Sequence, residues 1–214
     1  MEMVNMSSYV TVLQELKAKI REARYRAILS VNKEMIFLYW DIGAIILDQQ
    51  QKQGWGAKVI DKLSKDLTRS FPDMKGLSTR NLKYMRQFTR LYPDYKIVQE
   101  ALAQLTWYHI ITLMDKVKGE KERFWYAVQA IKNGWSRSVL VHQIESDVFS
   151  RSGKAVTNFK ATLPPPQSDL ARQIIKDPYN FDFLALKDDY NERVLEKALI
   201  DEVQRFLLEL GAGG

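Results

Sequence analysis

The chain has 214 residues, a length at which one or two domains can each bury a hydrophobic core. Hydrophobic residues make up 46% and charged residues 27%, which excludes a largely disordered or low-complexity chain. With no cysteine and only two histidines, the sequence excludes disulfide scaffolds, zinc ribbons, iron–sulfur clusters and thiol catalysis, and it fits a cytoplasmic protein.

We expect no membrane partner. The most apolar run, residues 35–47, is shorter than the roughly 20 residues needed to cross a bilayer, and it contains Asp41. The N-terminus lacks the basic and apolar regions of a signal peptide.

The net charge of +6 is concentrated in one part of the chain. Residues 52–90 hold ten Lys or Arg residues against three acids, so this segment alone exceeds the excess of the whole chain. A localised group of cations is the pattern expected for a protein that binds a polyanion.

The region from Tyr9 to about Gln51 has helical periodicity, and no proline interrupts it. We expect one very long helix, or two helices with a break near Gly43. The apolar residues fall on more than one stripe, which predicts packing in a helical bundle or a dimer. The first of them are Val10, Leu13, Leu16, Ile20, Ala23, Ala27 and Val31.

The basic segment is predicted to form two helices. The first runs from Ala57 to Ser70 and ends before Pro72, because proline disfavours helical geometry in the preceding residue. The second is capped by Ser78 and runs to about Tyr92. Two short helices joined by a glycine-containing turn resemble a helix-turn-helix.

Helical patterns continue at 97–104, 106–117, 119–132 and 136–150, and Asn133-Gly134 is a strong stop signal. Residues 151–167, which include a triple proline, read as a linker between a domain at 1–150 and another at 168–214. In the second domain we expect a short helix at 169–175, an irregular segment at 177–186 and an amphipathic helix at 192–210. No segment alternates as a strand would, so the predicted fold class is all-α.

The segment 78–92 has a distinct cationic face when its residues are placed 100° apart. A solvated helix usually mixes acids with bases to gain ion pairs, whereas this face has no acid, which indicates phosphate contacts. Arg and Gln also suit base edges in a major groove. The alternative is a solvated face that happens to be basic. The candidate DNA-binding residues are Lys58, Lys62, Lys65, Arg69, Lys75, Arg80, Lys83, Arg86, Gln87 and Arg90.

The residues alone show no catalytic site. His142 and Glu145 share a helical face and could bind a metal, but a structural hydrogen bond is the expected role. The aromatic residues between 107 and 135 recur at helical spacing beside aliphatic residues, which is typical of a core. The chain contains no P-loop, dinucleotide fingerprint, G-x-S-x-G or HExxH motif.

Several strings together resemble the YhcG family, in order and over essentially the whole chain. They are GWGAKVIDKLSKDLTRSFPDMKGLSTRNLKYMRQF at 54–88, LTWYHIITLMDKV at 105–117, NGWSRSVLVHQIES at 133–146, LPPPQSDLARQIIKDPYNFDFL at 163–184 and NERVLEKALIDEVQRFLLELGAG at 191–213. The resemblance implies a bacterial protein in which an N-terminal helical domain is joined to a PD-(D/E)XK nuclease domain that uses Mg²⁺ or Mn²⁺.

In the family, the catalytic aspartate and the Glu-x-Lys pair follow the helix that matches 192–210. The sequence stops before those strands, so we expect residues 168–214 to be an N-terminal fragment of the nuclease domain that is inactive alone. Glu196 matches a carboxylate that supports the metal site, and it could bind metal only together with the missing strands.

The functional prediction is therefore the DNA-binding and dimerising portion of a metal-dependent endonuclease, with duplex DNA and a second copy as partners. Two alternatives stay open: a protein-interaction module whose basic face binds an acidic partner, and an RNA-binding module.

Overall fold

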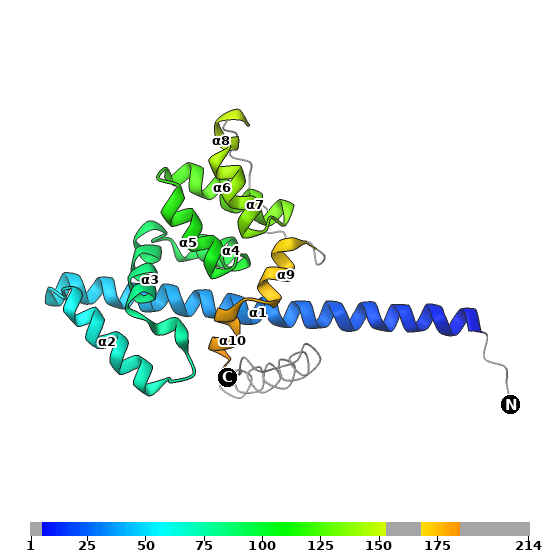
Figure 1. Ribbon diagram of the computed structural model, residues 1–214, viewed down its shortest axis with the longest axis horizontal. Helices are drawn as coiled ribbons and strands as arrows, with labels where there is room; N and C mark the ends of the chain where they lie inside the picture. The colour runs from blue at the N-terminus through cyan, green and yellow to red at the C-terminus, as the bar shows by residue number, and fades with distance from the viewer. Residues whose placement is uncertain (1–5, 153–167, 185–214) are drawn as a thin grey trace.

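The computed structural model describes residues 6–152 and 168–184, and all regular structure in these residues is helical (Figure 1). The elements are α1 (Met6–Gln53), α2 (Ala57–Ser70), η1 (Lys75–Leu77), α3 (Thr79–Leu91), α4 (Tyr95–Glu100), η2 (Leu102–Gln104), α5 (Trp107–Lys116), α6 (Glu120–Asn133), α7 (Arg137–Glu145), α8 (Val148–Arg151), α9 (Asp169–Ile175) and α10 (Pro178–Phe183). The predicted all-α class is confirmed for this part of the chain. The predicted linker and the helix at 192–210 lie outside the described residues.

The helix α1 is continuous through Gly43, so the alternative of two helices with a break at this glycine is wrong. Gly43 is buried where α1 crosses α3, and a Cβ atom at this position would collide with the carbonyl oxygen of Met85 and the hydroxyl of Thr89. The absence of a side chain therefore lets the two helix backbones approach each other closely.

Hydrogen bonds beside Gly43 fix this crossing. Thr89 Oγ1 donates to the carbonyl oxygen of Trp40 over 2.7 Å, and Trp40 Nε1 donates to the carbonyl oxygen of Tyr92 over 2.8 Å. These bonds join α1 to α3 and to Tyr92, the residue that follows α3, and α1 packs more extensively against α3 than against any other described element.

A buried polar contact ties η2, the residue that follows it and α10 to one point on α1. Asn32 of α1 donates from Nδ2 to the carbonyl oxygens of Ala103 and Leu105 over 2.9 and 3.0 Å. Asn180 of α10 donates to Asn32 Oδ1 over 3.4 Å, so α10 is tied to the same point. Leu170 and Ile174 of α9 belong to the same buried core.

Most predicted helix ends are confirmed by their caps. The hydroxyls of Ser78, Thr106 and Ser136 accept hydrogen bonds from backbone N–H groups in the first turns of α3, α5 and α7. Gly134 ends α6 in the left-handed conformation, with a φ of 62°.

Three predicted segments differ from the structure. The helix expected over 97–104 is α4 followed by the separate 3₁₀ turn η2. The helix expected to run from 136 to 150 breaks at Asp147, whose φ is 49°, and resumes as α8. The segment expected to be irregular contains α10, because Asp177 Oδ1 accepts from the backbone N–H of Tyr179 and allows proline in the first turn.

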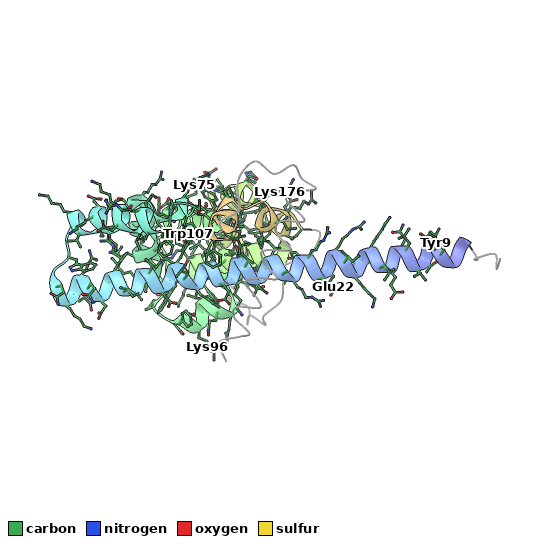
Figure 2. The ribbon with its side chains drawn as sticks, turned by 90° about the horizontal axis from the view of Figure 1, so that it is seen from below. Tyr9, Glu22, Lys75, Lys96, Trp107 and Lys176 are labelled. Atoms are coloured by element: carbon green, nitrogen blue, oxygen red, sulfur yellow. The ribbon has the colours of Figure 1, made fainter. Side chains whose placement is uncertain are left out.

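The N-terminal part of α1 extends away from the other described helices (Figures 1 and 2). Tyr9 and Glu22 lie on this projecting segment, whereas Trp107 lies within the packed body. From Tyr9 onward, where the side chains are described, Tyr25 is the first buried residue, so residues 9–24, which we call the stalk, have little contact with the body. No helix within 6–152 and 168–184 combines the length and hydrophobicity of a bilayer span.

Replacing Gly43 with alanine is expected to lower the free energy of unfolding by about 1 to 3 kcal/mol, because the added Cβ meets the backbone of α3. This outcome opposes the intrinsic preference for alanine over glycine in a helix, which is about 1 kcal/mol. Urea unfolding measures the change. Gly56→Ala is the control, since a Cβ there meets no atom within 4 Å. Equal or greater stability of Gly43→Ala would contradict the close crossing.

Candidate nucleic-acid interface

The helix α2 carries its cations in one narrow stripe on the solvent side. Lys58, Lys62, Lys65 and Arg69 are all exposed, and at 100° per residue they fall within about 60° of one another. Ile60 and Ser64 are buried on the opposite side of the helix. The amphipathic pattern of α2 therefore directs its cations to solvent.

The cationic face predicted for α3 is also on the solvent side. Arg80, Lys83 and Arg90 are exposed, and Arg86 and Gln87 are half-buried. The buried side of the helix contains Asn81, Leu82, Met85, Phe88 and Thr89. The separation of the two faces predicted from the sequence is confirmed, and Lys75 of η1 is exposed between the two helices in the chain.

Polar contacts fix α2 and α3 to each other and to the body. Ser64 Oγ donates to the carbonyl oxygen of Leu77 over 2.8 Å, which joins α2 to η1. Asn81 Nδ2 donates to the carbonyl oxygen of Gly76, and Asn81 Oδ1 accepts from Trp107 Nε1, both over 2.6 Å. The cationic helices therefore stand on a rigid support.

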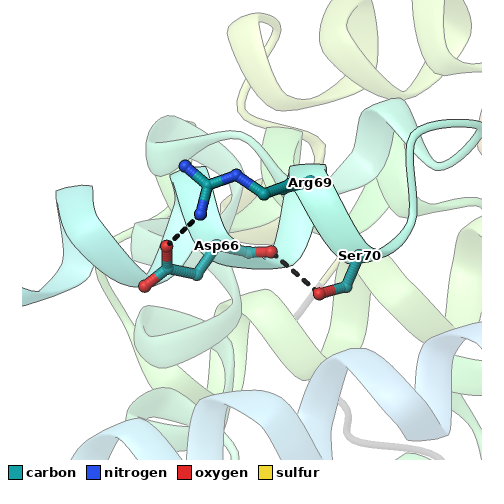
Figure 3. A network of polar contacts seen from close by, with 3 residues as sticks. All are labelled: Asp66, Arg69 and Ser70. Atoms are coloured by element: carbon teal, nitrogen blue, oxygen red, sulfur yellow. Dashed lines mark hydrogen bonds and ion pairs between the residues drawn. The ribbon is translucent and has the colours of Figure 1, made fainter.

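Three arginines of this surface, Arg69, Arg80 and Arg86, contact other residues. Arg69 pairs with Asp66 over 3.4 Å, and Ser70 Oγ donates to the carbonyl oxygen of the same aspartate (Figure 3). Arg86 donates from Nη1 to Gln50 Oε1 at the C-terminal end of α1 over 3.3 Å. The Arg69 pair is exposed, so its net contribution to stability is small.

Arg80 belongs to a contact with α5 that the sequence pattern did not reveal. Its guanidinium lies 5.6 Å from the centre of the Tyr84 ring, and Tyr84 Oη donates to Asp115 Oδ2 over 2.9 Å. Tyr84 raises the pKa of Arg80, and Asp115 contributes further in the same direction. An acid from a neighbouring helix therefore lies close to one edge of the cationic face.

Five cations of the predicted set have no ion pair or hydrogen bond with another described residue. They are Lys58, Lys62, Lys65, Lys83 and Arg90. Three of them belong to α2 and two to α3. The surface therefore consists of two adjacent groups, one on each helix.

Asn81 and Thr89 support the site, and the sequence analysis did not select them. Both are small polar residues on the packing side of an amphipathic helix. A buried polar side chain requires a hydrogen-bond partner, so this placement was a signal that could have identified them.

The chain matches two family models, one after the other along the sequence. The model of the DUF1016 N-terminal domain matches residues 15–151, and the model of the YhcG PDDEXK nuclease domain matches residues 172–214. The protein "Putative nuclease YhcG" of Escherichia coli (strain K12) is 29% identical over 230 aligned positions, which cover 90% of this chain and 60% of that protein. The chain thus spans about three fifths of this relative's length. No solved structure matches.

Catalytic chemistry cannot be assigned to the described residues. They contain no group of three or more histidines, aspartates or glutamates placed to bind a metal ion. Glu145 forms an ion pair with Lys116 over 2.8 Å, and this lysine lowers the pKa of the glutamate. The pair supports the structural role expected for Glu145, although its partner is a lysine from α5. Glu196 lies outside the described residues.

His109 is a core residue rather than a catalytic one. Its Nε2 lies 3.1 Å from the carbonyl oxygen of Trp135, and its Nδ1 lies 2.7 Å from Thr106 Oγ1. A neutral ring satisfies both contacts by donating from Nε2 and accepting at Nδ1. Burial lowers the pKa of His109 to about 4.

The lowered pKa of His109 makes the fold sensitive to acid. The pKa in the unfolded chain is about 6.5, so between these values only the unfolded chain binds the proton. Stability is therefore full above about pH 6.5 and falls as the pH approaches 4, by up to about 3 kcal/mol. In His109→Gln, the loss between about pH 7.5 and about pH 4.5 should be smaller than in the unmodified chain, as measured by urea unfolding.

His142→Gln is the matched control, because His142 is exposed. It should keep the pH dependence of the unmodified chain. If His109→Gln also keeps that dependence, or if NMR titration of His109 gives an ordinary pKa, the explanation is wrong.

Proposed function

Because the chain belongs to the YhcG family, with the DUF1016 N-terminal domain ahead of a match to a PDDEXK nuclease domain, we propose that α2, η1 and α3 bind duplex DNA for a nuclease. Its nuclease-related character follows from the family. Binding of DNA by the basic surface, and delivery of the nuclease to that DNA, are the proposal.

The observation that carries the proposal is the placement of the unpaired cations. Phosphates would neutralise Lys58, Lys62, Lys65, Lys83 and Arg90, which no carboxylate among the described residues neutralises. Gln87 and Arg90 also stand on the solvent side of α3, and both residue types can bind base edges. A merely solvated helix gains stability from mixed charges, and α3 contains no acid.

The metal chemistry of the proposed nuclease is assigned to the family and not to the described helices. A PD-(D/E)XK site would use Mg²⁺ or Mn²⁺, which binds oxygen ligands and activates water. The described residues do not fit such an ion, since they bring together no set of carboxylates. Glu196 is proposed to act there only as one member of a larger site.

Self-association is the second part of the proposal. The stalk exposes Tyr9, Val10, Val12, Leu16 and Ile20, each with half or more of its surface accessible. A continuous group of exposed apolar side chains typically marks an interaction surface. Two copies would present two basic surfaces to one duplex, which would strengthen binding without new contacts.

Binding of a labelled duplex by fluorescence anisotropy over a range of salt concentrations tests the DNA contact. Each cation that meets a phosphate should contribute about 0.9 to the slope of log K against log salt. We expect Lys58/Lys62/Lys65→Ala to flatten the slope by up to about 2.7, and Lys83/Arg90→Ala by up to about 1.8. Arg80 and Arg86 are left in place because they contact Tyr84 and Gln50.

The matched control is Lys96/Lys121/Lys132→Ala, which removes three exposed lysines from α4 and α6. Lys96 and Lys75 lie on opposite sides of α1 in Figure 2. The control should retain the unmodified slope. If the control flattens the slope equally, the cations act only as non-specific charge. If structured RNA or an acidic peptide binds more tightly than the duplex, that ligand and not DNA is the partner.

A further inference from the structure

The stalk carries an apolar stripe with the spacing of a coiled coil. Tyr9, Leu13, Leu16 and Ile20 follow one another at steps of four, three and four residues. Tyr9, Leu16 and Ile20 are 55%, 52% and 52% exposed, and Leu13 is half-buried. At 100° per residue, the four side chains fall within about 60° of one another.

The body covers this direction of α1 only beyond the stalk. Val31 lies in line with Ile20 around the helix and is 1% exposed, whereas Ile20 is 52% exposed. Tyr25, Ile28 and Asn32 lie about 80° to 140° around the helix from Ile20. The body helices that cover the C-terminal part of α1 therefore do not extend over the stripe. Another segment must cover it if it is to be buried.

We infer that two copies of the chain pair through their stalks as an antiparallel coiled coil, with Tyr9 facing the second copy's Ile20 and Leu13 facing the second copy's Leu16. The inference rests on the self-association proposed above and specifies its geometry. Its two-fold symmetry repeats each of these contacts, so eight apolar side chains close one core.

The residues that flank the stripe favour this direction. Val10 and Val12 flank its N-terminal half, whereas Lys17, Lys19, Arg24 and Arg26 flank its C-terminal half. In an antiparallel pair, each valine lies against the methylene stem of the second copy's Lys17 or Lys19, whose ammonium group still reaches water. The apolar end of one stalk thus meets the cationic end of the other.

A parallel pair would bring like charges together. In a parallel coiled coil, a flanking residue of one copy meets the flanking residue five positions later in the other copy. Lys19 of each copy would therefore lie beside the second copy's Arg24. Glu15 pairs with Lys19 in the same helix over 3.6 Å, which offsets part of this repulsion, so the apolar flank at Val10 and Val12 carries more of the preference for the antiparallel direction.

The length of the stalk also suits the antiparallel arrangement. In the proposed register, residue 6 lies opposite the second copy's residue 23, so the overlap ends just before the first buried residue, Tyr25. The overlap is about 27 Å long at 1.5 Å per residue. The two bodies then lie at opposite ends of the paired stalks and do not compete for space.

Cross-linking can read the direction directly, because the chain has no cysteine. Tyr9→Cys and Ile20→Cys chains are mixed and oxidised, and the linked peptides are identified by mass spectrometry. We expect links between positions 9 and 20 at least about tenfold faster than links between two copies of position 20, which would be about 16 Å apart along the axis. Ala18→Cys, on the opposite face, is the control for random collisions.

Light scattering on the full chain separates this inference from self-association itself. The unmodified chain should exceed the 24.9 kDa monomer mass at micromolar concentration, and Leu16→Lys should raise the dissociation constant about 100-fold or more. Ala18→Lys adds the same charge outside the stripe and should leave the dissociation constant unchanged.

A dimer that links position 20 to position 20 would overturn the antiparallel arrangement and leave self-association intact. A concentration-independent monomer would overturn both proposals. A monomer that binds an acidic helical peptide or anionic vesicles through the stripe would overturn them in the same way and assign the surface to another partner.

Discussion

The close crossing of α1 and α3 at Gly43 is the contact on which the rest of the structure depends. Without a side chain at this position, the backbone of α3 lies against α1, and Thr89 and Trp40 close hydrogen bonds across the contact. α3 in turn contributes the Asn81 contacts to Gly76 and Trp107. One small residue therefore determines where the cationic helix stands relative to the body.

The polar groups of α3 are divided by function around its circumference. Asn81 and Thr89 are buried, and their side chains form hydrogen bonds within the fold. Lys83 and Arg90 face solvent without a carboxylate partner in the described residues. Arg80 and Arg86, at the edges of the cationic face, contact neighbouring helices. The cations at the edges of the face are held by neighbouring residues, and those at its centre have no partner among the described residues. This arrangement is consistent with a rigid surface that presents charge to an external anion.

Local signals in the sequence predicted most of the helices. Contacts between residues far apart in the sequence could not be predicted from it. Signals that depend only on neighbours in the chain are confirmed: the cap at Ser78, the stop at Gly134 and the two faces of 78–92. Gly43 was interpreted as a possible break because its packing partner, 42 residues away at Met85, is not visible in sequence. The link from Arg80 through Tyr84 to Asp115 was missed for the same reason. Glu196 lies outside the described residues, so its assignment depends on the family.

Lysine footprinting with and without duplex DNA tests the central claim most directly, since it reads the contact surface on the unmodified chain. Acetylation rates are measured by mass spectrometry for every exposed lysine. The account predicts that DNA slows acetylation of Lys58, Lys62, Lys65 and Lys83, while Lys96, Lys121 and Lys132 keep their rates. Protection confined to the second group, or to Lys17 and Lys19 of the stalk, would contradict the assignment of α2 and α3 as the DNA-binding surface.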